Sequence, residues 1–505
     1  MISAFANTWK VPELRDRILF TMAMIVIVRL GVYLPLPGIN TAVVDEWLNL
    51  QAQGGDQDGP GGGVGAILNV FSGGGLAQMG VFALGIMPYI TASIMMQLLG
   101  AMVPKLARMQ KEDGGRQKIN QYTRYVTIAI ATVQGFMLAK SLENPGSNFL
   151  LQGIDEAIRS KGLLVPDYGP TFLFSTVLII VAGTMLLSWI GDQITERGIG
   201  NGISLIISVN IISALPGVIV QLWRTFVTDA GGNPFAPLTI VLLLVFFLFV
   251  IAATIAITQA QRRIAVQYAR RVSGRREMAG GTQYLPLKVN YAGVMPVIFA
   301  TAILQLPMVL LSQIFAGKKW VVSVQEVLSP NSPWFYVIAG AMIFGFSFFW
   351  VATMFRPSEI AENLKRGGGY IPGVRPGKPT ADFLDFTMTR LTFAGAIFLT
   401  LIFMLPFFTG LVLDLPPSSL VTSFFGGTSL LILVGVLLDM MRQIETFLLQ
   451  QQYDGFLRKG KIKGRGSRRT AMAKKTENSS VIYLWVALGV VVLIALVAAA
   501  SKGMI

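Results

Sequence analysis

Long apolar stretches separated by shorter polar segments dominate the chain. Each stretch holds about 20 predominantly apolar residues, enough for a helix to cross a bilayer core of about 30 Å. The eleven stretches are 18–36, 76–103, 122–141, 171–190, 202–222, 237–258, 291–314, 333–355, 391–412, 422–441 and 481–500. The first is too long for a signal-peptide core and has no A-x-A-like site after it, so we expect it to be retained. The pattern predicts an all-α membrane protein.

The first ten spans divide into two sets of five. An odd number of helices per set gives the sets opposite orientations in the membrane, as inverted-topology repeats require. We expect an N-terminal half at 1–236 and a C-terminal half at 237–446. Residues 447–480 include "GRGSRRTAMAKKTENSS" and form a basic, polar linker. They lead into an extra transmembrane helix within 481–505.

The composition agrees with this class and excludes much chemistry. Only 13% of the 505 residues are charged, against about 25% in soluble domains. The chain has no cysteine and no histidine, which removes thiol nucleophiles, disulfides, the commonest metal ligand and the commonest general base. We find no nucleotide-binding G-x-x-x-x-G-K-[ST] pattern, and we expect no cofactor, no metal and no catalytic residues.

Few ionisable groups lie inside the spans. Arg29 lies toward one end of the first span, and Asp439 lies near an end of the tenth. An ion-coupled transporter would place carboxylates near the middle of the membrane. The sequence therefore favours a passive pathway whose driving energy comes from elsewhere.

Positive charge orients the chain. Most of the 41 lysines and arginines lie on the N-terminal side of the membrane, whereas segment 37–75 has acidic residues and no lysine or arginine. Since cytoplasmic loops carry the excess of positive charge, we expect a cytoplasmic N-terminus.

One cytoplasmic loop, 259–290, is unusually basic. Its stretch "RRIAVQYARRVSGRRE" at 262–277 contains six arginines. Such a stretch can enforce topology alone, anchor lipid headgroups, bind nucleic acid or dock a soluble partner. The following "GGTQYLPLKVN" has turn residues and alternating apolar ones, which predicts a hairpin. A folded basic projection favours a partner made of RNA or carrying acidic patches.

A glycine-rich segment precedes the second span. "AQGGDQDGPGGGVG" at 52–65 does not favour a helix, and "AILNVFSGGG" at 66–75 offers two apolar turns before three glycines. The segment is either an ordinary external loop or a short helix that re-enters the membrane, sheltered by protein.

Several stretches together resemble the SecY family of protein-conducting channels, in its bacterial form. They are "SGGGLAQMGVFALGIMPYITASIMMQLL" (72–99), "ITERGIGNGIS" (194–204), "LPLKVNYAGVMPVIFA" (285–300), "AENLKRGGGYIPGVRPGKPTADFLD" (361–385) and "FGGTSLLILVGVLLDMMRQIE" (425–445). The resemblance covers roughly 5–466. It implies a ten-helix channel of two inverted halves that conducts unfolded secretory chains and releases apolar segments sideways into lipid.

The resemblance also assigns site residues. It places a plug at about 64–75, carried by Ile67, Leu68, Asn69, Val70 and Phe71. A lateral gate between spans two and three and spans seven and eight would use flexible side chains of span two. These are Met87, Met95, Met96 and Gln97. We expect a mid-membrane ring of branched apolar side chains, formed by Ile86, Ile90, Ile207, Ile211, Ile298 and Ile432.

The same resemblance answers the question raised by the arginines. Arg275, Arg276 and, in the cytoplasmic loop 356–390, Arg375 lie at positions that dock a translating ribosome or the motor ATPase SecA. Implied partners are SecE, SecG, signal peptides, unfolded preproteins and membrane lipids, and the implied location is the bacterial inner membrane.

Two departures from the family and two alternatives stay open. The external insertion at 51–61 looks long, and the eleventh span is extra, either a lipid anchor or a substitute for the SecG helix. A solute transporter would need a polar mid-membrane site, and a ribosome-recruiting scaffold would leave the plug and the isoleucines unexplained.

Overall fold

The computed structural model describes most of the chain. The described residues are 12–53, 69, 71–109, 112, 114–143, 145, 154–224, 236–268, 271–273, 276–278, 281–314, 319–329, 331–413, 420–425 and 427–458. The linker after residue 458 and the extra span at 481–500 lie outside them. The chain divides into two compact units, Leu19–Met441 and the pair of segments Met1–Ile18 and Arg442–Ile505.

The second unit contains the first residues of one helix and the last residues of another. Helix α2 (Pro12–Val32) starts in it, and helix α20 (Gly427–Arg458) ends in it. The Arg17 guanidinium lies 4.8 Å from the centre of the Phe447 ring, a cation–π contact between the two segments.

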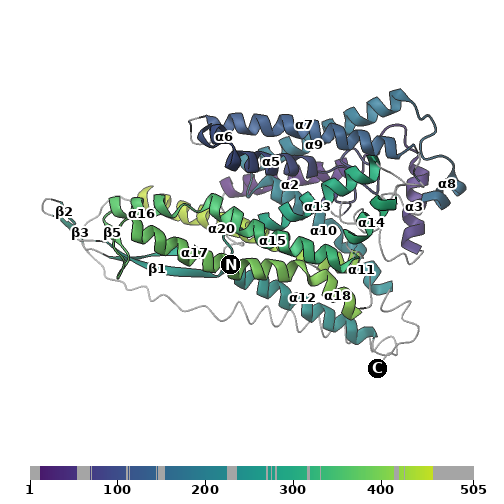
Figure 1. Ribbon diagram of the computed structural model, residues 1–505. Helices are drawn as coiled ribbons and strands as arrows, with labels where there is room; N and C mark the ends of the chain where they lie inside the picture. The colour runs from purple at the N-terminus through teal and green to yellow at the C-terminus, as the bar shows by residue number, and fades with distance from the viewer. Residues whose placement is uncertain are drawn as a thin grey trace. The chain divides into compact units, whose positions relative to one another are not determined.

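The large unit, Leu19–Met441, is mostly helical (Figure 1). Its other helices are α3 (Thr41–Gln53), α5 (Met87–Met102), α6 (Pro104–Met109), α7 (Gly115–Ser141), α8 (Ile154–Lys161), α9 (Pro170–Arg197), α10 (Gly202–Ser213), α11 (Leu215–Trp223), α12 (Ala236–Gln259), α13 (Met295–Ile314), α14 (Lys319–Val327), α15 (Pro333–Met354), α16 (Pro357–Arg366), α17 (Lys378–Phe403), α18 (Leu405–Leu413) and α19 (Leu420–Phe425). Counting α2 and α20, each of the first ten apolar stretches of the sequence overlaps at least one helix of the structure.

Four helical stretches of the described chain are individually long and apolar enough to cross a membrane. They are Pro170–Arg197, Gly202–Trp223, Pro333–Arg366 and Lys378–Gly410. The described part of the chain also has shorter apolar helices at Leu243–Gln259 and Met295–Leu304. Together with the sequence pattern, these helices make the chain a membrane protein.

The second apolar stretch is not one helix. The sequence predicts a span at 76–103, but residues 73–86 form turns and the helix begins only at Met87. The backbone of the turn segment pairs instead with the chain that follows α2: Leu34 O accepts from Val81 N at 2.8 Å, and Met79 O accepts from Leu36 N at 3.0 Å. These hydrogen bonds to the neighbouring chain satisfy polar groups that a helix would otherwise satisfy.

The helices pack in neighbouring sets. Helices α5, α7 and α9 contact one another in sequence, and α13, α15 and α17 do the same (Figure 1). Aromatic rings join α15 to α17, because the Phe403 ring lies 6.1 Å from Phe335 and 5.8 Å from Tyr336. Burying large rings in this way is a major source of packing energy.

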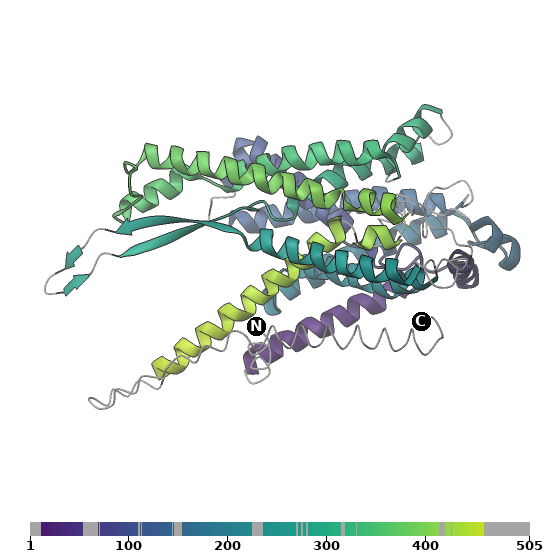
Figure 2. The same cartoon turned by 90° about the horizontal axis from the view of Figure 1, so that it is seen from below.

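The predicted hairpin is confirmed. Strands β1 (Gln261–Tyr268) and β4 (Thr282–Lys288) pair antiparallel over seven residues and project away from the helices (Figure 2). Strands β2 (Arg271–Ser273) and β3 (Arg276–Met278) pair at its far end. A two-residue strand, β5 (Gly369–Tyr370), pairs with the other edge of β1 and completes a β4-β1-β5 sheet.

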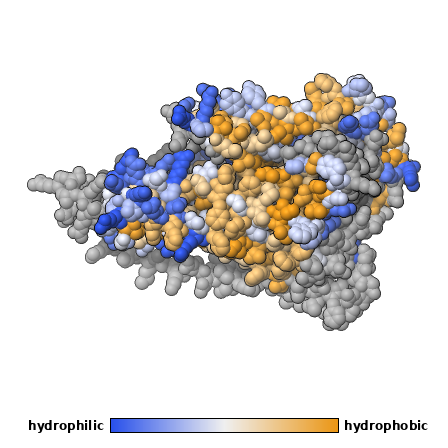
Figure 3. Space-filling model, viewed as in Figure 1, coloured by the Kyte–Doolittle hydropathy of each residue, from blue (hydrophilic) through white to orange (hydrophobic). Residues whose placement is uncertain are grey.

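Apolar side chains cover the helices of the large unit on the face shown in Figure 3, whereas hydrophilic side chains gather at the end that carries α16. Large apolar side chains are exposed on several helices, among them Phe174, Leu178 and Trp189 of α9 and Val337 of α15. Exposed apolar area on this scale is expected of a surface that meets lipid.

Candidate functional site

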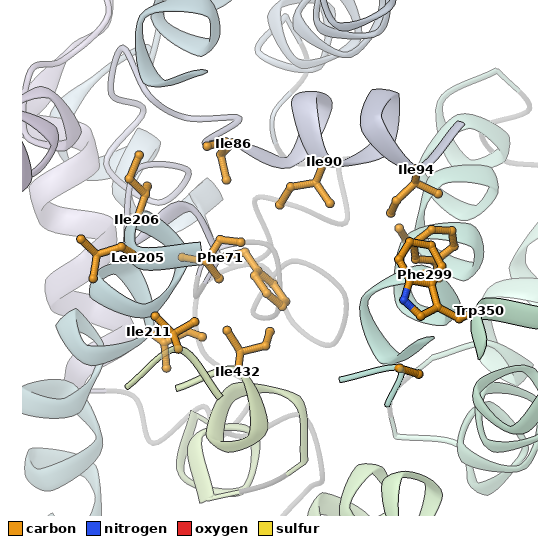
Figure 4. Packing of buried hydrophobic residues seen from close by; sticks show 14 of the residues in the cluster. Phe71, Ile86, Ile90, Ile94, Leu205, Ile206, Ile211, Phe299, Trp350 and Ile432 are labelled. Atoms are coloured by element: carbon orange, nitrogen blue, oxygen red, sulfur yellow. The ribbon is translucent and has the colours of Figure 1, made fainter. Parts of the chain in front are cut away.

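The isoleucines proposed for the ring come together in one buried cluster. Ile86, Ile90, Ile207, Ile211 and Ile432 belong to it with exposed fractions between 0% and 7%, and Ile298 is partly buried and packs against it. These residues come from α5 and its start, α10, α13 and α20, which are far apart in the sequence. Figure 4 shows Ile86, Ile90, Ile211 and Ile432 arranged around the side chain of Phe71.

Helix geometry brings these side chains to one place. Residues four apart share a helix face, so Ile207 and Ile211 point the same way from α10. Ile86 caps α5 with a non-helical backbone, and Pro88 lies in the first turn of the helix, two residues before Ile90. The side chains are branched and apolar, so the centre presents bulk without hydrogen-bonding groups.

Phe71, from the glycine-rich segment before α5, occupies this centre. Of the residues predicted for the plug, Asn69 and Phe71 are described, whereas Ile67, Leu68 and Val70 lie outside the described residues. Phe71 is 7% exposed and belongs to the isoleucine cluster. Asn69 closes a compact turn, because its side-chain oxygen accepts from Ala77 N at 3.1 Å and its backbone oxygen accepts from Gly74 N at 2.9 Å.

The four residues assigned to the lateral gate do not share one environment. Met96 is buried and Met87 packs against the central cluster, but Met95 is 45% exposed. The Gln97 amide donates to Ser93 Oγ at 3.4 Å, and its Oε1 is buried without a hydrogen-bond partner in the described structure.

The side chain of α5 that faces α13 and α15 is Ile94, which the sequence reasoning missed. It is 3% exposed and points toward Phe299 and Trp350 (Figure 4). These two rings pack edge to face with centroids 5.2 Å apart. A signal was present in the sequence, since Ile94 follows Ile90 at an interval of four and shares its helix face.

The arginines of the basic loop lie on the projecting hairpin. Arg276 begins β3 and pairs with Ser273, whereas Arg275 lies outside the described residues. Arg262 and Arg263 are exposed on β1, near the helices. The hairpin thus carries positive charge along its length.

Arg375 lies at the tip of the neighbouring loop and is exposed. The tip is held at both ends: Thr380 Oγ1 donates to Arg375 O at 2.8 Å, and Val374 N donates to Ile371 O at 3.0 Å. Gly373 and Gly377 have φ of +82° and +105°, conformations that favour glycine. The Tyr370 hydroxyl, also in this loop, lies 2.9 Å from Gln267 Oε1 of β1 and donates to it, so hairpin and loop share one folded body.

No group of three or more acidic side chains is suitably placed to hold a metal ion within the described parts of the chain. The described candidate site consists of an apolar centre and a basic surface on the hairpin and the Arg375 loop.

The fold is that of solved protein-conducting channels. A solved SecY structure, described as showing that the plug domain stabilises the closed state of the translocation channel, matches with a TM-score of 0.56 at 17% identity, covering 87% of this chain and 94% of that one. Sec61 in the canine ribosome–channel complex matches with a TM-score of 0.53 at 16% identity, again covering 87% and 94%.

The sequence comparisons identify the family. The SecY family model matches residues 80–441. The protein translocase subunit SecY of Chlamydia trachomatis is 40% identical over 469 residues, covering 92% of this chain and 100% of that protein. The Escherichia coli K12 subunit is 41% identical over 458 residues, covering 90% and 96%. The chain belongs to the SecY family, whose members are protein-conducting channels and not enzymes.

Proposed function

We propose that this chain is the central pore-forming subunit of a protein translocase. It conducts unfolded secretory polypeptides across the bacterial inner membrane and releases apolar segments into lipid. The observation that carries the proposal is that isoleucines from distant parts of a SecY-family chain, Ile86 and Ile90, Ile211 and Ile432, surround Phe71 (Figure 4). A closed apolar centre within a membrane protein has the form of a shut pore.

The ten helices form two inverted halves in this proposal, 1–236 and 237–446, with the N-terminus in the cytoplasm. The basic hairpin and the Arg375 loop then lie on the cytoplasmic side, in keeping with the excess of lysine and arginine there. The additional span at 481–500 stands outside the ten-helix unit.

The six isoleucines act as a gasket, and the segment ending at Phe71 acts as the plug. Branched apolar side chains dewet a narrow constriction and so oppose the passage of ions. They also make no hydrogen bonds that would hold a moving chain, and they are indifferent to which residue passes. A general exporter needs both properties.

The seam between α5 and the pair α13 and α15 provides the sideways exit. Met87, Met95, Met96 and Gln97 of α5 offer flexible or polar groups to an entering signal peptide, since thioethers adapt to many shapes. Ile94, Phe299 and Trp350 close the seam in the resting state through apolar packing. An apolar segment can replace these contacts at little net cost.

The basic hairpin and the Arg375 loop bind the partners that supply the driving energy. Arg275, Arg276 and Arg375 contact a translating ribosome or the SecA motor, and SecE and SecG complete the membrane complex. Arginine suits this task because it binds phosphate and carboxylate groups with two hydrogen bonds at once. The shared folding of hairpin and loop through β1 and β5 supports a single surface.

Reconstitution tests the function directly. The full chain is incorporated into vesicles with a SecE partner, and a preprotein with its signal sequence is added with SecA and ATP. We expect the preprotein to become protected from external protease only when ATP is present. A preprotein that stays accessible, in vesicles where the complex is intact, contradicts the proposed function.

Reversing the charge at the hairpin tip should weaken ribosome binding. In the double variant Arg275→Glu and Arg276→Glu, we expect affinity to fall by at least about tenfold at low salt, because each phosphate contact releases counterions. The parent should also lose affinity as salt rises, with a shallower slope in the variant. Reversing Arg159, which is exposed on α8 at the opposite predicted side, is the control. Binding that is insensitive to both charge and salt would exclude this role.

A further inference from the structure

A buried polar side chain contacts the segment that occupies the apolar centre. Asn210 of α10 is 2% exposed and immediately precedes Ile211. Its Nδ2 donates to the backbone oxygen of Phe71 at 2.9 Å, across 139 residues of chain. Its Oδ1 is buried and has no hydrogen-bond partner among the described residues. A buried amide that is only partly satisfied is costly, so its presence in an apolar centre needs a reason.

A second polar side chain holds the same segment from another helix. Arg29 of α2 donates through Nη1 to the backbone oxygen of Gly73 at 3.0 Å. Its guanidinium also lies 5.5 Å from the centre of the Tyr33 ring, and Nη2 donates to the Tyr33 hydroxyl at 3.3 Å. The Tyr33 contacts position the arginine, and a charge-assisted bond of this kind is stronger than a neutral one.

Both polar side chains lie close to Gly73. Gly73 has a φ of +68°, and a Cβ added there would lie 2.6 Å from Asn210 Oδ1 and 2.8 Å from Arg29 Nη1. A side chain at this position would therefore push both polar groups away. The sequence supplies the residue that lets both groups reach the backbone on either side of Ser72.

We propose that Asn210 and Arg29 form a latch that holds the segment Phe71–Gly73 in the closed channel by its backbone. The proposal rests on the pore function proposed above and adds the residues that set how firmly the resting pore is shut. Apolar packing of Phe71 alone is non-directional. Two hydrogen bonds from different helices fix the position of the segment, and separation of α2 from α10 must break at least one of them.

Both contacts reach carbonyl groups rather than side chains. The hold on Phe71–Gly73 therefore depends on the backbone path, not on the side chains of the segment. We expect the strength of these two hydrogen bonds to depend on Asn210 of α10 and Arg29 of α2.

Resting conductance tests the latch. The full chain, purified with its partner subunits, is placed in planar bilayers without preprotein. We expect Asn210→Leu, which keeps a branched side chain but cannot donate, to raise resting ion conductance about fivefold, the factor typical of one neutral hydrogen bond. Arg29→Met should raise it by about tenfold or more, and Arg29→Lys, which keeps charge and a donor, should raise it less.

The matched control is Ser208→Ala. Ser208 is a buried polar residue of the same helix, and its hydroxyl donates to Ser204 O within α10, not to the latched segment. We expect this variant to stay as ion-tight as the parent. Equal leak from Ser208→Ala and Asn210→Leu would mean that any polar loss in α10 loosens the helix, and it would overturn the latch.

A second measurement does not depend on conductance. The chain has no cysteine, so Ser72→Cys introduces a single thiol into the segment, at a position that is 3% exposed. A membrane-impermeant thiol reagent should react slowly with this chain, and several-fold faster when Asn210→Leu or Arg29→Met is also present. Ser208→Ala should not change the rate.

The outcomes separate the latch from the proposed function. If the parent transports preprotein but both latch variants remain as tight and as slowly labelled as the parent, the latch is wrong and the pore stands. If the parent neither transports preprotein nor conducts ions when preprotein engages it, the proposed function itself fails. Leak and faster labelling confined to the latch variants support the proposal.

Discussion

Replacing Ile432 by asparagine is expected to make the resting channel leak ions. Ile432 is 2% exposed and points into the centre occupied by Phe71 (Figure 4). An amide placed there without partners costs about 1–3 kcal/mol in the closed state and attracts water into the ring. We therefore expect resting conductance to rise by at least about tenfold, with export of preproteins whose signal sequences are defective. Single-channel recording and an export assay measure the two effects.

Two variants of the same helix control this experiment. Ile432→Val keeps a branched apolar side chain and should remain nearly ion-tight. Leu437→Asn introduces the same amide at a position that is 49% exposed, away from the centre, and should not create a leak. If Ile432→Asn were as tight and as strict about signal sequences as the parent, the constriction would have to lie elsewhere.

Reversing the charge of Arg375 is expected to abolish SecA-driven transport. The side chain is exposed at a tip held by the Thr380 hydroxyl and by two glycines with positive φ, so it is presented to a partner in one position. A glutamate there removes the bidentate donor and repels an acidic surface. We expect transport into vesicles to fall by about a hundredfold or more, with normal insertion and expression of the variant.

The control makes the same charge change at a different position. Lys378→Glu alters an exposed residue three positions further along, at the start of α17, outside the tip. We expect this variant to lose much less activity. Equal loss in both variants would show that total charge, rather than the shaped tip, governs the interaction, and normal transport by Arg375→Glu would exclude the role altogether.

The sequence located the helices better than their ends. Hydrophobic length alone found each of the four described helical stretches that can cross a membrane, because burial and lipid exposure both require long apolar runs. It misplaced the start of α5, since residues 76–86 are as apolar as a helix but are held in turns by Leu34 and Leu36. Such long-range pairing leaves no local signal apart from glycines, which also occur within membrane helices.

Part of the candidate site could also be predicted from the sequence. The four-residue spacing of Ile86 and Ile90, and of Ile207 and Ile211, predicts shared faces, and the structure places all four in one buried cluster. That Ile298 and Ile432 join them depends on how distant helices pack, which came only from family resemblance. Asn210 gave no signal, because one amide in an apolar helix is ordinary until its partner at Phe71 O is known.

The short strand β5 has a mechanical consequence. It joins the long hairpin to the neighbouring loop through two residue pairs, Gln267 with Tyr370 and Tyr268 with Gly369, and one side-chain hydrogen bond. At about 1 kcal/mol for each net hydrogen bond, this pairing is weak beside the backbone hydrogen bonds of α12 or α17. We therefore expect a weak pull on the hairpin to be transmitted to the loop through β5. A stronger pull should separate β1 from β5 before either helix unfolds.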